Sequence, residues 1–125
     1  AYTLSKFGMS MCMLGLSEEL RGDGIACNTL WPRTTIATAA IEFALGGEAV
    51  MRRSRKPEIM ADAAHVMLTR PTRSFTGQFT IDDSVLYDFG VRDFDVYHNA
   101  PGEPLQVDLL VDPGETLPFT VDFAE

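Results

Sequence analysis

Residues 1 to about 21 predict a helix whose apolar side chains cover most of its circumference, until the polar Ser17-Glu18-Glu19 and Arg21. A helix that is apolar nearly all round is buried on several sides. We therefore expect one side of this helix to face a sheet and another side to face a partner subunit. The turn Arg21–Gly24 ends the helix, and residues 25–31 form an apolar run that predicts a short buried strand, which Pro32 ends.

The pattern beyond Pro32 predicts short helices and one further strand. The expected elements are a helix over residues 38–45 that Gly46-Gly47 ends, a helix from Pro57 to about Thr69, a strand over residues 75–83 and a helical turn over residues 84–89. A helix, a tight turn and an apolar strand together make one half of a βαβ crossover. The predicted fold class is therefore α/β with a parallel sheet.

Two segments differ in composition from the rest. Residues 51–56 hold the densest cluster of positive charge, which we interpret as a solvated loop in preference to an anion site. Residues 99–125 hold four prolines, six acids and no Lys or Arg, yet they keep too many apolar side chains for a plain disordered tail. We therefore divide the chain into a domain over residues 1–98 and an acidic arm over residues 99–125, which we expect to pack on its own subunit or on a neighbour.

Composition and charge exclude several classes of function. The chain has 125 residues, 46% of them hydrophobic, which suits one soluble domain. A net charge of −8 argues against a nucleic-acid partner, and the lack of an apolar run of about 18 residues argues against a membrane span. Cys12 and Cys27 have apolar neighbours and are interpreted as buried free thiols of a cytoplasmic protein; with two histidines they give little support to a metal site. Because the chain starts at Ala1 inside an apparent helix, we interpret it as the C-terminal part of a longer protein.

Tyr2 and Lys6 lie four residues apart at the start of the first helix, so their side chains lie one above the other on one face. A phenol beside an ammonium is a suitable pair for proton transfer. The ammonium favours the phenolate and lowers the pKa of Tyr2 from about 10 towards the working pH. The same spacing occurs by chance in many helices, so the pair alone does not identify an enzyme.

The loop from Pro32 to Thr38 follows the carboxyl end of the first strand, which is the edge of an open α/β sheet where ligands bind. Three hydroxyls, from Thr34, Thr35 and Thr38, and the backbone N–H groups of the loop could hold an amide or a phosphate. Thr34 or Thr35 could instead cap the next helix. Both interpretations can hold together.

Four features in register resemble the short-chain dehydrogenase/reductase family. They are Tyr2-x-x-x-Lys6, a strand ending in Asn28-x-x-x-Pro32, a Thr-rich loop, and Phe75-Thr76-Gly77-Gln78-x-x-Ile81-Asp82-Asp83. The similarity covers residues 1 to about 90. It implies a Rossmann-type, doubly wound parallel sheet, of which this chain supplies the C-terminal part.

The resemblance implies an NAD(P)-dependent oxidoreductase that interconverts a carbonyl and a secondary alcohol. Tyr2 would be the general acid/base, and Lys6 would lower the pKa of Tyr2 and bind the nicotinamide ribose. The residues that would line the cofactor, either NAD or NADP, are Pro32, Thr34, Thr35, Ile36 and Thr38. Family members often pack the helix that bears the tyrosine against its copy in another subunit, so a homo-oligomer, either a dimer or a tetramer, is also implied.

The chain departs from the family pattern in two ways. Arg33 stands where the family has a glycine after the loop proline, and because Arg cannot adopt glycine's positive φ cheaply, the loop path is expected to differ. The glycine-rich phosphate loop, the residue that selects NAD from NADP, and the active-site Asn and Ser all lie upstream in the family, outside residues 1–125. A non-catalytic fragment or a pseudoenzyme acting in subunit assembly is therefore the alternative function. The sequence does not indicate which substrate is bound.

Overall fold

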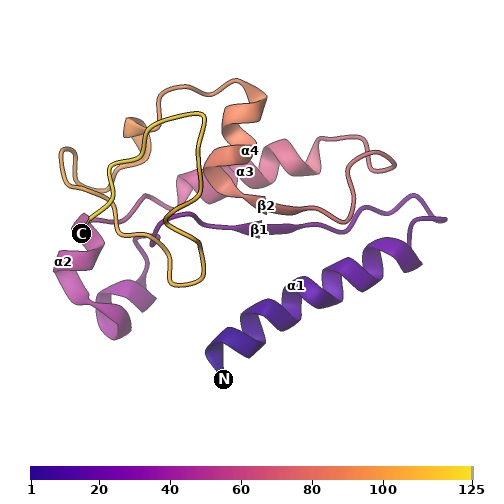
Figure 1. Ribbon diagram of the computed structural model, residues 1–125, viewed down its shortest axis with the longest axis horizontal. Helices are drawn as coiled ribbons and strands as arrows, with labels where there is room; N and C mark the ends of the chain where they lie inside the picture. The colour runs from indigo at the N-terminus through magenta and orange to yellow at the C-terminus, as the bar shows by residue number, and fades with distance from the viewer. Residues whose placement is uncertain (125) are drawn as a thin grey trace.

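The computed structural model describes residues 1–124 and has helices on both sides of a short parallel sheet (Figure 1). In chain order the elements are α1 (Tyr2–Glu19), β1 (Thr29–Trp31), the π-helical turn η1 (Ile41–Leu45), α2 (Gly47–Arg52), α3 (Glu58–Leu68), β2 (Phe79–Ile81), α4 (Asp82–Phe89) and the 3-10 turn η2 (Asp95–Tyr97). Within residues 1–124, no helix has the length and apolar character needed to cross a membrane.

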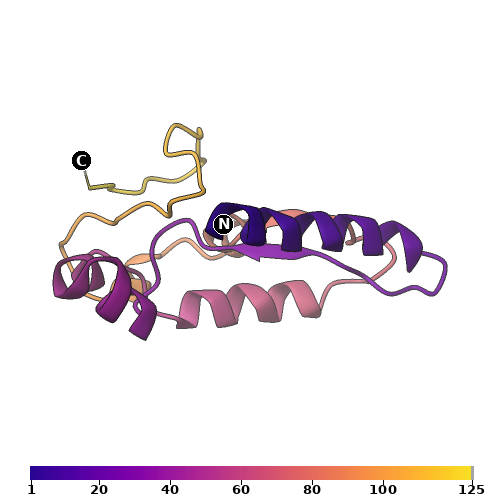
Figure 2. The same cartoon turned by 90° about the horizontal axis from the view of Figure 1, so that it is seen from below.

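The strands β1 and β2 run parallel and are paired directly, with Thr29 opposite Phe79 and Trp31 opposite Ile81. The chain between them passes through α3, so strand, helix and strand form a βαβ crossover, which follows the helix–turn–strand unit α1–β1 on which the prediction rested. Seen from below, α1 lies against one face of the sheet and α3 lies against the other face (Figure 2). The α/β class with a parallel sheet is therefore confirmed.

The main core lies on the α3 side of the sheet. Its buried apolar residues are Ile59, Ala63, Val66, Val85, Leu86, Phe94 and Tyr97. Leu30 of β1 and Ile36 of the following loop pack against this core from the sheet side. Because α3 and α4 contribute most of these side chains, the helices position the loop that follows β1.

Both strands are shorter than the sequence predicts. Residues 25–28 do run beside residues 75–78, and the Gly77 amide donates to the carbonyl of Cys27 at 2.8 Å. Side chains interrupt the ladder, however, because the Cys27 amide donates to the hydroxyl of Thr76 at 3.1 Å and the Asn28 side chain donates to the Phe75 carbonyl at 3.0 Å. Gly77 also has φ +72°, which an extended strand does not allow. Regular pairing therefore begins only at Thr29 and Phe79.

The acidic pair Asp82-Asp83 begins helix α4, whereas the sequence predicts that it ends a strand. Carboxylates in the first turn of a helix are stabilised by the partial positive charge of that end. The Oδ1 atom of Asp82 also accepts the amide hydrogen of Asp83 at 2.8 Å. Both effects favour helix from Asp82 onwards, so α4 runs to Phe89 and ends at Gly90, whose φ is +117°.

Helix α1 leaves apolar side chains exposed in this single chain, and the predicted contact of its other side with a partner subunit stays a prediction. The side chains of Leu4 and Met11 are 79% and 65% exposed, whereas Ser10 and Ser17 are buried against the sheet. The two-stranded sheet is too narrow to cover more than one side of the helix. The prediction of buried thiols is wrong for Cys12, which is exposed; Cys27 is half-buried, and both thiols are free.

The acidic segment after residue 99 folds back over the loop that follows β1 (Figure 1). Val107 pairs with Thr34 in an antiparallel bridge, and Leu105 pairs with Phe123. Leu105 is only 1% exposed, so the segment has a buried anchor of its own. It therefore packs on its own chain across the carboxyl end of β1.

Candidate functional site

Tyr2 and Lys6 lie at the start of α1, and the Lys6 ammonium is 5.4 Å from the centroid of the Tyr2 ring. Tyr2 is 55% exposed and Lys6 is half-buried. Both line a pocket of about 260 Å³ between α1 and the open edge of β1, and Pro32 lines the same pocket. Tyr2 and Lys6 thus line one hollow that runs along β1 as far as Pro32, just past the carboxyl end of the strand.

The other residues of the predicted cofactor loop are placed differently. Thr34 is fully buried and its hydroxyl donates to the Thr35 carbonyl at 3.2 Å. The Thr35 hydroxyl shares a hydrogen bond of 2.8 Å with the hydroxyl of Ser54. Neither threonine caps a helix, so that alternative interpretation is wrong. Ile36 packs against the core, whereas Thr38 is exposed and its carbonyl accepts the Ile41 amide at 3.0 Å.

Among the pocket residues that the sequence did not predict, Asp108 and Leu110 come from the acidic segment. The Asp108 amide donates to the carbonyl of Arg33 at 2.9 Å, directly beside the Thr34–Val107 bridge. Burial raises the pKa of Asp108, while the Leu110 amide and the positive charge of Lys6 oppose that rise. Only the return of a distant segment places this carboxyl here, so no local sequence signal could have found it.

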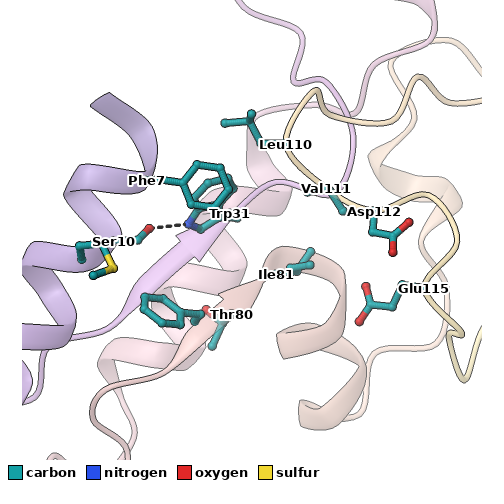
Figure 3. Close-up of a pocket in the computed structure, with 11 residues that line it drawn as sticks. Phe7, Ser10, Trp31, Thr80, Ile81, Leu110, Val111, Asp112 and Glu115 are labelled. Carbon is teal, nitrogen blue, oxygen red and sulfur yellow. Dashed lines mark hydrogen bonds between the residues drawn. The ribbon is translucent and has the colours of Figure 1, made fainter. Parts of the chain in front are cut away.

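A second hollow, of about 420 Å³, lies on the other flank of α1 (Figure 3). Its walls are mostly apolar, from Phe7 and Met11 of α1 and from both strands, and the carboxyls of Asp112 and Glu115 lie at one end. The Trp31 ring nitrogen donates to the hydroxyl of Ser10 at 3.0 Å, and both residues line the two hollows. This contact separates the apolar hollow from the pocket of Tyr2 and Lys6.

Arg33 is 1% exposed and lies in a buried charge cluster beneath the loop. Its Nε atom donates to both carboxylate oxygens of Asp83, at 2.8 and 2.9 Å. Its other nitrogens donate to Glu115 at 2.7 Å and to the hydroxyl of Ser84 at 2.8 Å. The described residues other than glycine all have negative φ, so Arg33 takes an ordinary backbone conformation and uses its side chain to hold the loop against α4.

Arg55 belongs to the same cluster, which corrects the prediction that residues 51–56 form a solvated loop. Its side chain is 1% exposed and donates to Asp83 at 2.7 Å. Arg52, in contrast, is exposed and pairs with Glu103 at 2.8 Å. The pattern of charge does not distinguish these two arginines, because only the fold brings a buried carboxylate to one of them.

Asp82 is fully buried in this cluster and only half satisfied. Its Oδ1 atom accepts the amides of Arg33 at 3.0 Å and Asp83 at 2.8 Å, whereas its Oδ2 atom has no hydrogen-bond partner among residues 1–124. Burial, with the adjacent charge of Asp83, raises the pKa of Asp82 to about 6. The amide bonds and the charge of Arg55 oppose the rise. No group of three or more His, Cys, Asp or Glu in the described part of the chain could hold a metal ion.

Two sets of known proteins are similar to this chain: relatives found by their sequence, and solved structures. A hydroxysteroid dehydrogenase-like protein 2 from Danio rerio is 55% identical over 112 residues, which cover 90% of this chain and 26% of that protein. The protein of the same name from Homo sapiens is 49% identical over the same shares. No family model matches the chain.

Solved structures give the same result at the level of the fold. A short chain dehydrogenase from Mycobacterium thermoresistibile superposes with a TM-score of 0.83 and 51% identity, over 96% of this chain and 42% of that one. A putative dehydrogenase from Xanthomonas campestris gives 0.82 and 49%, over 89% and 40%. The Rossmann-type parallel sheet is therefore confirmed, although the chain spans about a quarter of the first relatives and about two-fifths of these structures. Over nine-tenths of its length the chain is thus about half identical to hydroxysteroid dehydrogenase-like protein 2 and to a short chain dehydrogenase, and it shares the fold of the matching part of the latter.

Proposed function

We propose that this chain carries the proton-transfer pair of an NAD(P)-dependent oxidoreductase that interconverts a carbonyl and a secondary alcohol. One observation carries the proposal: Tyr2 and Lys6 together line a pocket that runs along β1 to Pro32, in a chain that is about half identical to a short chain dehydrogenase. The relatives extend well beyond the matched region, so the activity is proposed for a protein that supplies the remainder of the fold.

In carbonyl reduction, a nicotinamide held beside Tyr2 and Lys6 would be the source of the hydride for the carbonyl carbon. The Tyr2 hydroxyl then donates its proton to the carbonyl oxygen as negative charge develops there. The Lys6 ammonium, close to the Tyr2 ring, stabilises the phenolate that remains. In alcohol oxidation the same phenolate removes the hydroxyl proton, so one pair of side chains serves both directions.

The donors around the pocket suit the ribose and the carboxamide of a nicotinamide nucleotide. The Lys6 ammonium and the Tyr2 hydroxyl can both bond ribose hydroxyls from within the pocket. The hydroxyls of Thr34 and Thr35 are occupied inside the protein, so we assign these residues to shaping the loop. Pro32 lines the pocket directly, and the exposed Thr38, with the backbone at Ile36, is proposed to meet the rest of the cofactor. Either NAD or NADP fits this part of the site.

The experiment compares the Tyr2→Phe variant with the unsubstituted protein. Both are prepared as the full-length natural protein that contains this sequence. We expect turnover of a panel of alcohols and carbonyls to fall by about 10²–10⁴-fold. Because Tyr2 is 55% exposed, the melting temperature should change little, and protection of the fold by NADH or NADPH should persist.

A matched control is Tyr87→Phe, since Tyr87 lies away from the pocket and packs on Phe119 with ring centroids 5.0 Å apart. This variant should keep normal turnover. If Tyr2→Phe retains normal turnover as well, Tyr2 is not the general acid/base. If neither cofactor protects the protein, the oxidoreductase proposal fails as a whole.

A further inference from the structure

Residues 108–115 form a loop that is fastened to one residue, Arg33, at both of its ends. At the first end, the Asp108 amide donates to the Arg33 carbonyl at 2.9 Å. At the second end, the Nη1 atom of Arg33 donates to the carboxylate of Glu115 at 2.7 Å. Compact surface loops whose ends lie close together often carry function.

Between these two points the loop is hydrogen-bonded only to itself. The Leu110 amide donates to the Oδ1 atom of Asp108 at 3.1 Å, and the Gly114 amide donates to the Oδ1 atom of Asp112 at 2.8 Å. Among residues 1–124, no hydrogen bond joins residues 109–114 to a residue outside the loop. The loop can therefore move as a unit once one of its two ends is released.

The loop forms a wall of both hollows beside α1. Leu110 lines the pocket of Tyr2 and Lys6 as well as the apolar hollow. Val111 lines the apolar hollow, and Figure 3 shows its side chain on the returning segment beside that hollow. Movement of the loop away from α1 would therefore widen both hollows together.

The two ends of the loop differ in strength. The first end continues an antiparallel pairing, in which the Thr35 amide donates to the Gln106 carbonyl at 2.9 Å. Val107 pairs with Thr34 in the same short ladder. The second end depends on Glu115, whose side chain is 46% exposed, so water competes for its carboxylate. We therefore expect the second end to open first.

The groups on either side of the second end are held in place. The Nε atom of Arg33 donates to both carboxylate oxygens of Asp83, at 2.8 and 2.9 Å, so the guanidinium stays with the body of the protein. On the other side of Glu115, the ring of Phe119 packs against the core. Release of Glu115 would thus free residues 109–118 and leave the remainder of the acidic segment anchored.

We propose that residues 108–115 are a lid over the two hollows, and that the Arg33–Glu115 ion pair is the latch that keeps this lid closed. Which molecule enters the pocket rests on the proposed function, whereas the lid and its latch do not. Without the latch the lid should swing about residue 108. The Asp108 amide should then exchange its hydrogen faster, and Trp31, which lines both hollows, should become more accessible.

The first measurement is amide hydrogen exchange at single residues by NMR, in the full-length natural protein that contains this sequence, without cofactor. In Glu115→Ala we expect exchange at the Asp108 amide to become roughly three- to tenfold faster, because the lost bond joins charged groups of which one is screened by solvent. The Leu105 amide is the internal reference. It donates to the Asp122 carbonyl at 2.7 Å beside a buried side chain, and it should keep its rate.

The second measurement is the quenching of Trp31 fluorescence by acrylamide. Trp31 is the only tryptophan among residues 1–125, and its signal is isolated by subtracting the same measurement made with Trp31→Phe. Quenching should increase in Glu115→Ala, because the lid carries Leu110 away from the hollows that Trp31 lines. Loss of an ion pair that served only stability would not expose this ring in the folded protein.

Glu103→Ala is the matched control. Glu103 belongs to the same acidic segment and pairs with Arg52 at 2.8 Å, but it lies outside the lid. This variant should leave both measurements unchanged. Glu115→Gln keeps an oxygen that can accept the Arg33 N–H group without the charge, so its effects should be smaller than those of Glu115→Ala.

Unchanged exchange at Asp108, unchanged quenching of Trp31, an equal acceleration at Leu105, or equal effects in Glu103→Ala would each overturn the proposal. Failure of both Glu115 variants to fold while Glu103→Ala folds would also overturn it, because Glu115 would then serve the fold. Neither measurement needs cofactor or turnover. A failed lid would therefore leave the role of Tyr2 standing, and normal turnover in Tyr2→Phe would leave the lid standing.

Discussion

Asp82 is a carboxyl whose ionisation should destabilise the protein. It shares its buried cluster with the guanidinium groups of Arg33 and Arg55 and with the carboxylate of Asp83, and Arg33 pairs in addition with the exposed Glu115. Asp82 is fully buried, and its Oδ2 atom has no hydrogen-bond partner within residues 1–124. An ionised carboxylate at such a buried site lowers the free energy of unfolding relative to a neutral group of the same shape.

The cost follows from the pKa of Asp82, which burial raises from 3.8 to about 6. Each unit of difference between the folded and unfolded pKa corresponds to about 1.4 kcal/mol, so the full effect is about 3 kcal/mol. The folded state holds the proton more tightly than the unfolded state does. This contribution to stability is therefore fully present below the unfolded pKa of 3.8 and is lost as the pH rises to about 6 and beyond.

Asp82→Asn should remove the loss of stability that ionisation of Asp82 causes at higher pH. The amide keeps an oxygen for the Arg33 and Asp83 amides and carries no charge. Well above the folded pKa, at about pH 8, we expect the variant to be more stable than the parent by about 1 to 3 kcal/mol. At about pH 4 the parent carboxyl is itself largely protonated when folded, so the difference should nearly vanish.

The assay is urea unfolding of the full-length natural protein that contains this sequence, at both pH values, with the midpoint and the m-value measured separately. Asp88→Asn is the control, because Asp88 lies on the same helix α4 but is exposed. It should change the free energy of unfolding by at most about 0.5 kcal/mol at either pH. If Asp82→Asn is destabilising at the higher pH, or if its gain is equal at both, the account of this buried carboxyl is wrong.

Two further substitutions test the packing around the loop. Arg33→Ala should destabilise by about 3 to 5 kcal/mol because it removes a buried guanidinium and leaves the buried Asp83 carboxylate with Arg55 as its remaining charged partner. The same change at the exposed Arg52 should cost under about 1 kcal/mol, and similar losses in urea midpoints would contradict the buried cluster. Gly77→Ala should cost about 1 to 2 kcal/mol in thermal unfolding, because Gly77 has φ +72° and a Cβ there would lie 3.0 Å from the Ser17 hydroxyl oxygen, whereas Gly22→Ala, with open space around it, should be nearly neutral.

Features set by local periodicity were predictable from the sequence. The apolar pattern of the first 21 residues predicts helix α1, and a spacing of four residues places Tyr2 and Lys6 on one face of it. Pro57 predicts where α3 begins. The parallel α/β class follows from the order of helix, turn and apolar run, because a parallel pair requires a crossover. The resemblance to short-chain dehydrogenases was predicted from short motifs in register, and the similarity to such proteins is confirmed.

Only the tertiary structure decided which polar groups are buried and which meet. In the sequence Arg33 and Arg55 resemble surface charges. In the fold both are buried and donate to the carboxylate of Asp83, which lies 50 residues from Arg33 along the chain. Asp108 reaches the pocket of Lys6 only because residues 106–108 pair with the loop after β1. Local patterns determine the conformation of a few turns, but contacts between distant segments depend on register and packing across the whole fold, which no single stretch of this sequence contains.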